Sequence, residues 1–163
     1  MTVGRCNDRD MQGTSHNSPI HRRLIDALYV EAMVLADDAR SYFDEGGRDD
    51  REALGPMERV TFSCESLKVT TRLMHVIAWL LTQRAVLSGE LRARDALDPS
   101  RRLGEPPATF GDTVTELPAE ARALVASSID LHRRVARLDA AQEAPLPEES
   151  PARQMFQRLA MAF

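Results

Sequence analysis

The stretch of residues 56–88 constrains the fold most, because it holds no glycine and no proline after Pro56. Along it, apolar or small residues recur at alternating steps of four and three, which keeps one face of an α-helix turned toward a neighbour. The stretch therefore predicts a helix of roughly 50 Å. This seam, which we expect to be buried, consists of Val60, Cys64, Leu67, Thr71, Met74, Ala78, Leu81 and Ala85.

Two further rows flank the seam, one of Thr70, Leu73, Ile77 and Leu80 and one of Val69, Val76 and Trp79. A helix with apolar residues on several sides needs neighbours on several faces, so we interpret it as the central rod of a bundle. A membrane span needs about 20 predominantly apolar residues. Only eleven residues, 73–83, are free of Lys, Arg, Asp and Glu, which favours a buried core helix.

The length of 163 residues indicates a single domain. With 43% hydrophobic and 28% charged residues, the chain can form a hydrophobic core. The net charge of −4 argues against a general nucleic-acid binder, which needs a basic face. Cys6 and Cys64 form no recognisable pair, and no apolar signal segment follows Met1. We therefore expect a reduced, cytoplasmic setting, with Cys64 behaving as a small buried hydrophobe.

The first helix is expected to begin at Ser18-Pro19, an N-cap followed by proline in the first turn, and to run to about Phe43. Residues 1–17 before it show no apolar period and are interpreted as a flexible leader. Residues 44–47 are predicted to end the helix. Its apolar stripe is predicted to consist of Ile20, Leu24, Ala27, Leu28, Val34, Leu35 and Tyr42.

Residues 44–52 form an acidic connection, with five carboxylates against two arginines. It is either a solvated loop or a recognition edge for a basic partner. In the second case, the contact residues are Asp44, Glu45, Arg48 and Asp49.

A second connection, residues 98–117, is rich in proline and glycine and long for a compact domain, so it is a functional loop or a connector. Phe110 within it is either a staple onto the bundle, which we favour, or an exposed anchor.

A third helix is predicted over residues 117–141, with arginines on its solvated face. Its seam again alternates steps of four and three: Leu117, Ala121, Leu124, Ser128, Leu131, Val135 and Leu138.

Prolines after residue 141 break the chain again, and residues 150–163 form a short amphipathic tail. Met155, Phe156 and Leu159 lie near one face of this tail. It is either docked on the bundle or a detachable element that binds a groove as a helix.

No catalytic or metal-binding motif is present: the sequence has no H-E-x-x-H, G-x-S-x-G, C-x-x-C or phosphate-binding glycine pattern. We predict no enzyme activity and no cofactor. The alternative is a small-ligand or cation-binding helical bundle with weak enzymatic activity. It would need a polar pocket among Glu31, Glu65, His75 and His132. Without an inward histidine partner, Glu31 and Glu65 are expected either at flank positions of their helices or paired with an arginine such as Arg72.

Several runs of the sequence resemble the RcdA family of alphaproteobacteria, the regulators of CtrA degradation. In the central helix these are residues 65–67 (ESL), 70–74 (TTRLM), 79–81 (WLL), 83–86 (QRAV) and 89–90 (GE). Flanking matches are residues 41–44 with Gly47-Arg48, residues 102–104 (RLG) and residues 135–139 (VARLD). The likeness covers about residues 18–141.

The resemblance implies a non-enzymatic adaptor of the cell cycle that brings CtrA and other cargo to the ClpXP protease alongside further adaptors. It also implies a dimeric three-helix bundle. We therefore expect an all-α, antiparallel three-helix bundle over residues 18–141, with a linker and tail over residues 142–163. We expect a cytoplasmic homodimer that binds proteins, and neither nucleic acid nor membrane. The candidate partner-binding residues are Asp44, Glu45, Arg48, Asp49, Phe110, Met155, Phe156 and Leu159.

Overall fold

The computed structural model describes residues 18–143, and within that range it contains helices and connections but no strand. The all-α class is thus confirmed. The predictions for the leader and for the tail residues Met155, Phe156 and Leu159 lie outside the described residues. The elements are α1 (Pro19–Ser41), a π-helical turn (Tyr42–Gly46), α2 (Arg48–Ala53), α3 (Pro56–Ser88), α4 (Ala93–Ala96), a 3₁₀ turn (Pro99–Arg101), α5 (Gly111–Val114) and α6 (Ala119–Glu143).

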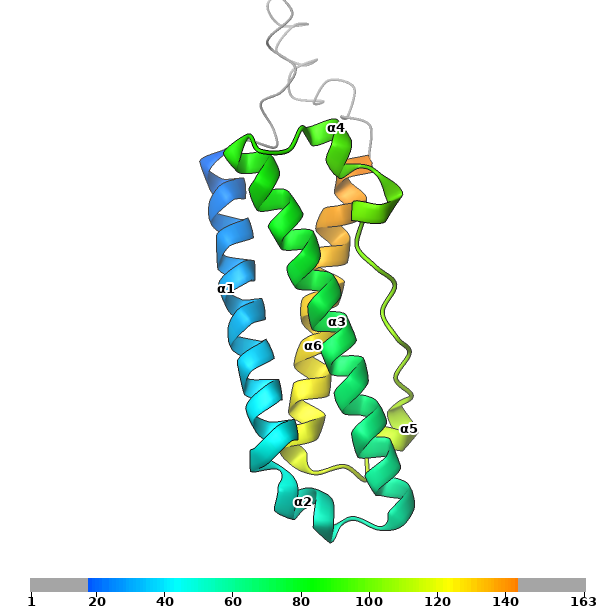
Figure 1. The fold of residues 1–163 in the computed structure, drawn as a ribbon. Coiled ribbons are helices and arrows are strands. Elements are labelled where there is room, and N and C mark those ends of the chain that lie inside the picture. Colours follow the sequence, from blue (N-terminus) through cyan, green and yellow to red (C-terminus); the bar gives the residue numbers. More distant parts are fainter. Residues whose placement is uncertain (1–17, 144–163) are drawn as a thin grey trace, which may run out of the picture.

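The three long helices α1, α3 and α6 lie side by side, and their directions differ from the prediction (Figure 1). α1 is antiparallel to α3, but α3 and α6 run in the same direction. Two hydrogen bonds confirm this: Arg72 bonds to Ser128, and Trp79, further along α3, bonds to Asp139, further along α6. Residue numbers therefore increase in the same direction along both helices. The prediction of a wholly antiparallel bundle was therefore wrong. The long connection between α3 and α6 makes the parallel arrangement possible by returning along the bundle.

The helix ends follow the sequence signals. Ser18 caps α1 by accepting a hydrogen bond from the backbone N–H of His21 at 3.1 Å, and Pro19 occupies the first turn. α3 spans the predicted 56–88 stretch. It ends at Gly89, whose φ of 81° is left-handed and favours glycine.

The acidic connection is not a loop. The chain continues past α1 through the π-helical turn and then forms α2. The buried Tyr42 organises this corner, since its hydroxyl donates a hydrogen bond to Asp50 Oδ2 at 2.8 Å. Gly47 lies against the tyrosine ring, where a Cβ would come within 2.9 Å of it. The prediction that residues 44–47 end the first helix is confirmed, since helical winding continues to Gly46 and the chain turns at Gly47. The interpretation of residues 44–52 as a loop was wrong, because this aromatic anchor folds the acidic segment back into α2.

The core lies between one face of each long helix. The predicted seam of α6 is confirmed, since every one of its positions is buried or half-buried in the structure. On α3, by contrast, the predicted seam is not the core face: Leu67 is 68% and Met74 64% exposed. Cys64 is also exposed, so the prediction of a buried cysteine was wrong. The buried face of α3 is Phe62, Glu65, Val69, Arg72, Leu73, Val76, Trp79, Leu80 and Gln83.

The stripe of α1 was predicted only in part. Leu28 and Tyr42 are buried, while Ile20, Leu24 and Val34 are exposed. The small side chains of Ala32 and Ala39, together with Ile25, form the buried face, because they allow α1 to lie close to α3 and α6. No helix within residues 18–143 combines the length and the hydrophobicity that crossing a membrane requires.

Candidate protein-interaction surfaces

Residues 102–110, which we call the strap, run in extended form along α3 and α6 (Figure 1). Three sets of hydrogen bonds hold the strap to these helices. The polar groups of the bundle that form these hydrogen bonds are used within the protein, whereas the other exposed groups are accessible to a partner.

The lowest set is centred on Arg72, a buried guanidinium that is 1% exposed. It donates to the carbonyl oxygen of Pro107 at 2.9 Å and to the hydroxyl of Thr109. Thr109 in turn donates to Glu65 Oε2 at 2.7 Å, so its hydroxyl links the two buried charges. Thr109 is thus the central residue of this network.

Two further groups complete the network. Lys68 Nζ lies 2.7 Å from Glu65 Oε1, and Arg72 also donates to Ser128 Oγ at 3.3 Å. Burial lowers the pKa of Arg72, and the negative charge of Glu65 opposes that shift. The ion pair of Glu65 is therefore with Lys68, and its link to Arg72 runs through the hydroxyl of Thr109.

A second set holds the upper end of the strap. Arg102 binds Asp139 through two parallel contacts, Nε to Oδ1 at 2.8 Å and Nη2 to Oδ2 at 3.0 Å. The indole of Trp79 donates to the same Oδ1 at 2.6 Å. This bidentate geometry is the strong form of an arginine–carboxylate pair. It joins the strap, α3 and α6 at one carboxylate.

The third set uses a histidine pair between α3 and α6. His132 Nε2 donates to the carbonyl oxygen of Gly104 at 2.9 Å, which fixes the tautomer of that ring. Burial lowers the pKa of His132, and the hydrogen bond to Gly104 opposes that shift. The ring of His75 lies so close to Gly104 that a Cβ there would come within 2.7 Å of Nδ1. Only glycine leaves room for the strap at this point.

The four residues of the alternative polar pocket are not brought together. Glu31 forms an ion pair with Arg134 on the bundle surface, while Glu65 is occupied by Thr109 and Lys68. The rings of His75 and His132 are 6.5 Å apart, centre to centre. Across residues 18–143, no three His, Cys, Asp or Glu side chains gather in a way that could hold a metal ion.

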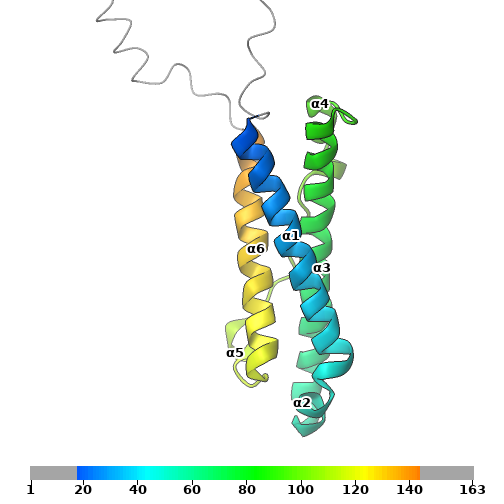
Figure 2. The ribbon, with the colours of Figure 1, turned by 90° about the vertical axis from the view of Figure 1, so that its left-hand side faces the viewer.

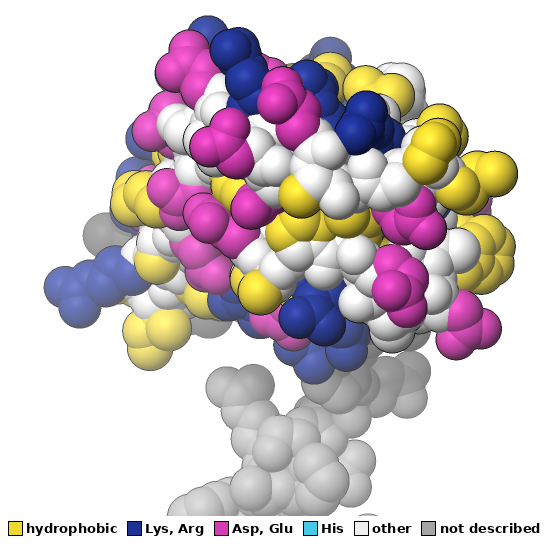
Figure 3. All heavy atoms as spheres, turned by 90° about the horizontal axis from the view of Figure 1, so that it is seen from below, with side chains coloured by type: hydrophobic (Ala, Val, Ile, Leu, Met, Phe, Trp, Pro, Cys, Tyr) yellow, Lys and Arg dark blue, Asp and Glu magenta, His cyan; other side chains and the backbone are white. Residues whose placement is uncertain are grey.

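The acidic corner is one exposed surface of the molecule. Asp44, Glu45, Arg48 and Asp49 are all exposed there. Figure 3, a view from below, shows Asp and Glu side chains gathered toward one side of this end. Three of the predicted contact residues, Glu45, Arg48 and Asp49, line a shallow depression.

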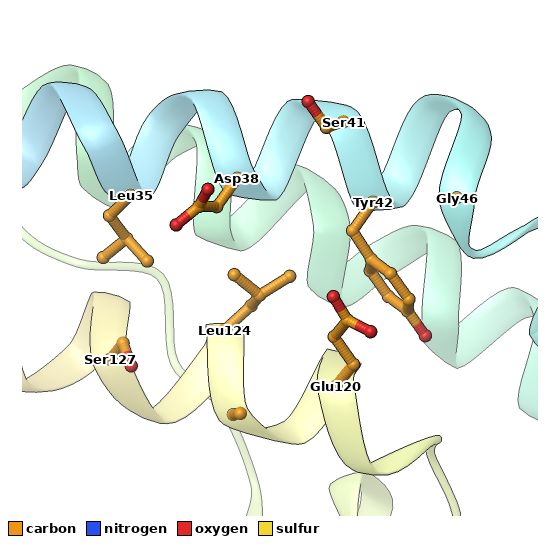
Figure 4. A pocket seen from close by; sticks show the side chains of 9 residues that line it. Leu35, Asp38, Ser41, Tyr42, Gly46, Glu120, Leu124 and Ser127 are labelled. Atoms are coloured by element: carbon orange, nitrogen blue, oxygen red, sulfur yellow. The ribbon is translucent and has the colours of Figure 1, made fainter.

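An open cleft of about 590 Å³ lies next to this corner, between the end of α1 and the start of α6 (Figure 4). Asp38 extends into it from α1 toward Leu35 and Leu124, and Glu120 extends from α6 beside the ring of Tyr42. Burial and the neighbouring Asp50 raise the pKa of Tyr42, so its hydroxyl stays protonated. Two carboxylates on an open cleft are suited to a basic side chain of a protein partner.

The most extended apolar surface is the outer face of α3, which consists of the eight seam positions from Val60 to Ala85. Six of them are exposed, and Thr71 and Ala85 are half-buried. Figure 2 shows α3 on the side of the molecule away from α6, with α1 crossing in front of both helices.

Phe110 is 67% exposed at the lower end of the strap. The favoured interpretation of Phe110 as a staple onto the core was wrong, and the alternative, an exposed anchor, agrees with the structure. The strap is held by Thr109, the preceding residue, and this leaves the ring free for another contact.

A family model described as a protein of unknown function, DUF1465, matches residues 16–163. The crystal structure of RcdA from Caulobacter crescentus CB15 is similar to this chain, with 34% sequence identity and a TM-score of 0.61. That similarity covers 73% of this chain and 90% of the other. The chain belongs to the RcdA family. The comparison with curated proteins found no match.

The RcdA resemblance in the sequence therefore included residues whose role only the structure shows. Arg102, Gly104 and Asp139 belong to the short flanking matches, and all three hold the strap. Thr109 was missed, since a single threonine in a proline-rich connection gives no signal of its own. The matched region also extends to residue 163 and so includes Met155, Phe156 and Leu159.

Proposed function

We propose that this protein is a non-enzymatic adaptor that promotes proteolysis of a CtrA-like response regulator and related cargo by ClpXP in the cytoplasm. The observation that carries the proposal is membership of the RcdA family, with 34% identity to RcdA over most of both chains. The geometry is compatible with it. The buried Glu65, Arg72, His132 and Asp139 all bind the strap or residues beside it, which assigns them a structural task.

The contacts with partners are proposed to lie on the exposed surfaces. These are the acidic corner of Asp44, Glu45, Arg48 and Asp49, the exposed ring of Phe110, and the tail residues Met155, Phe156 and Leu159. An acidic corner favours a basic partner surface and speeds encounter with it. Several weak contacts on linked segments add through effective concentration, so an adaptor needs no single strong site.

The adaptor is further proposed to act as a homodimer. A dimer presents two copies of each weak surface and therefore increases avidity for cargo and protease. The exposed apolar side chains of α3 are a feature that self-association would remove from water.

Affinity purification from the native cell tests the adaptor proposal. Wild-type protein is expected to retain protease subunits and a response regulator. A variant with Asp44→Lys, Glu45→Lys and Asp49→Lys is expected to retain less of them without loss of helical content, because these side chains are exposed. Equal recovery of partners by both proteins would remove the acidic corner from the proposal, and absence of any protease subunit would contradict the adaptor function.

A metal assay on the purified protein tests the alternative, a cation-binding bundle. One equivalent of bound metal, lost with Glu65→Gln or His132→Gln, would favour that class over the adaptor.

A further inference from the structure

An apolar pocket of about 260 Å³ lies at the end of the bundle where α3, α4 and α6 meet. Figure 1 shows α4 and the last turns of α6 together at this end. A cavity of roughly 150 Å³ already holds a benzene ring, so this pocket has room for an aromatic side chain with an aliphatic neighbour. We call it the end pocket; its apolar lining consists of Val86, Leu87, Ala93, Ala96 and Leu97.

The end pocket also includes a buried donor that lacks an acceptor. Gln83 lines the pocket and is 5% exposed, and its Oε1 accepts a hydrogen bond from Gln142 Nε2 at 2.6 Å. Its own Nε2 has no hydrogen-bond partner within residues 18–143. A buried polar group without a partner costs free energy, and a peptide carbonyl in the pocket supplies the missing acceptor. The pocket therefore combines an apolar lining with a donor for a peptide backbone.

The tail, residues 150–163, is joined to the bundle close to this pocket. α6 ends at Glu143, and Gln142, the residue before it, lines the pocket. Residues 144–154 span up to roughly 35 Å at about 3.1 Å per residue, which is enough for the chain to turn back. A short linker gives an effective concentration in the millimolar range, so even a weak site becomes occupied.

Charge favours the same occupant. Arg94 lines the end pocket with a side chain that is 73% exposed. It lies 3.7 Å from Asp95, which Arg92 holds more closely at 2.7 Å. A tail seated in the pocket brings the carboxylates of Glu148 and Glu149, which directly precede it, toward Arg94.

We propose that the tail folds back on its own bundle and seats apolar side chains from Met155, Phe156 and Leu159 in the end pocket. These side chains match the apolar lining, and the backbone that carries them supplies carbonyl groups for Gln83. The proposed function assigns the same three side chains to partners, so a partner and the end pocket compete for the tail. That competition rests on the proposed function, whereas the docking itself does not.

The docking is expected to be reversible. A Kd of roughly 1 mM for one small pocket and an effective concentration of roughly 2 mM leave about two-thirds of the tails docked. A protease that cuts only the free tail is then slowed about threefold. At 1.36 kcal/mol per tenfold, this is about 0.65 kcal/mol, which changes Tm by only about 2 °C.

Limited proteolysis of the purified chain tests the docking. Trypsin cleaves after Arg153 and Arg158 in the tail, and the arginines within residues 1–17 give an internal reference. Leu97→Asp places a charge in the pocket lining and is expected to speed cleavage of the tail about threefold. Met33→Asp on α1 is the matched control, because Met33 and Leu97 are both 44% exposed, and it should leave the rate unchanged.

A second variant blocks the pocket without adding a charge. Ala93 is exposed and lines the pocket, so Ala93→Phe fills part of the space that the tail would occupy. It should speed cleavage of the tail as Leu97→Asp does, with unchanged helical content by circular dichroism.

Cysteine cross-linking tests the contact itself, with Cys6 and Cys64 replaced by serine. Leu97→Cys combined with Phe156→Cys is expected to form a disulfide within one chain under mild oxidation. Glu90→Cys combined with Phe156→Cys is the control, since Glu90 is exposed near the same end of the bundle and does not line the pocket. The control should cross-link several-fold more slowly.

Three results would overturn the docking. One is equal cleavage of the tail in the wild type, Leu97→Asp and Ala93→Phe when all three are folded. Another is equally fast cross-linking from Glu90→Cys and Leu97→Cys. Disulfides that form only between two chains would show that the pocket takes the tail of another molecule.

These tests need purified protein alone, so they remain valid if the adaptor function fails. If they show docking and Leu97→Asp leaves the recovery of partners from cells unchanged, the docking stands and the competition with partners is wrong. Greater recovery of partners with Leu97→Asp than with Met33→Asp would support both.

Discussion

Replacing Thr109 by valine removes the hydroxyl that joins the two buried charges beneath the strap and keeps the shape of the side chain. Arg72 and Glu65 are each 1% exposed, and Thr109 accepts from one and donates to the other. The variant therefore loses two hydrogen bonds to charged groups and leaves both charges less well satisfied.

The cost follows from what remains. A hydrogen bond to a charged group contributes about 1.5–3 kcal/mol, so two give an upper range of roughly 3–6 kcal/mol. Arg72 keeps Pro107 and Ser128, and Glu65 keeps Lys68, so neither charge is left without a partner. We therefore expect a loss of about 2–4 kcal/mol in the free energy of unfolding, or roughly 5–15 °C in Tm.

Equilibrium unfolding in urea, followed by circular dichroism, measures this loss. Thr113→Val is the matched control, because that hydroxyl donates only to the nearby carbonyl of Phe110 on the surface. It should change the free energy of unfolding by no more than about 0.5 kcal/mol. If Thr109→Val is as stable as Thr113→Val, the hydroxyl does not bridge the charges and the account of the strap is wrong.

Three further predictions concern other parts of the molecule. Asp139→Asn should destabilise the fold by about 2–4 kcal/mol in urea unfolding, because it leaves the buried Trp79 and Arg102 contacts without their charge; no change in the unfolding midpoint would contradict the anchor. Burial lowers the pKa of His132 in the fold, so the unfolded chain takes up a proton first as pH falls below about 6.5. The Tm should therefore fall from pH 7 to pH 5.5, and His132→Gln should flatten that slope; an unchanged slope would refute this origin. Deleting residues 150–163 should weaken partner pull-down and leave helical content and Tm intact, whereas loss of the fold would make the tail structural.

The contrast between α3 and α6 shows how far the sequence determines the fold. On α6 the apolar seam lies opposite arginines such as Arg133 and Arg137, so only one face can be the core, and the prediction was right. On α3 both sides are apolar. The buried side carries the charged residues Glu65 and Arg72, whereas the outer side carries no charge. The sequence pattern therefore favoured the outer side as the core face, which was wrong.

The connections were the hardest part to predict. The strap has few apolar residues, and its position depends on buried polar partners far along the chain, Glu65, Arg72, His132 and Asp139. Hydrophobic period carries no information about such partners. The acidic connection was misassigned for a similar reason, because the aromatic anchor Tyr42 and the nearby Gly47 decide its path.

The most direct measurement of the central claim is the rate at which purified ClpXP degrades a CtrA-like response regulator, with its other adaptors present, before and after this protein is added. The account predicts that wild-type protein raises the rate and that deletion of residues 150–163 or charge reversal at Asp44, Glu45 and Asp49 reduces the gain. An unchanged rate with folded wild-type protein, at every concentration tested, would contradict the adaptor function.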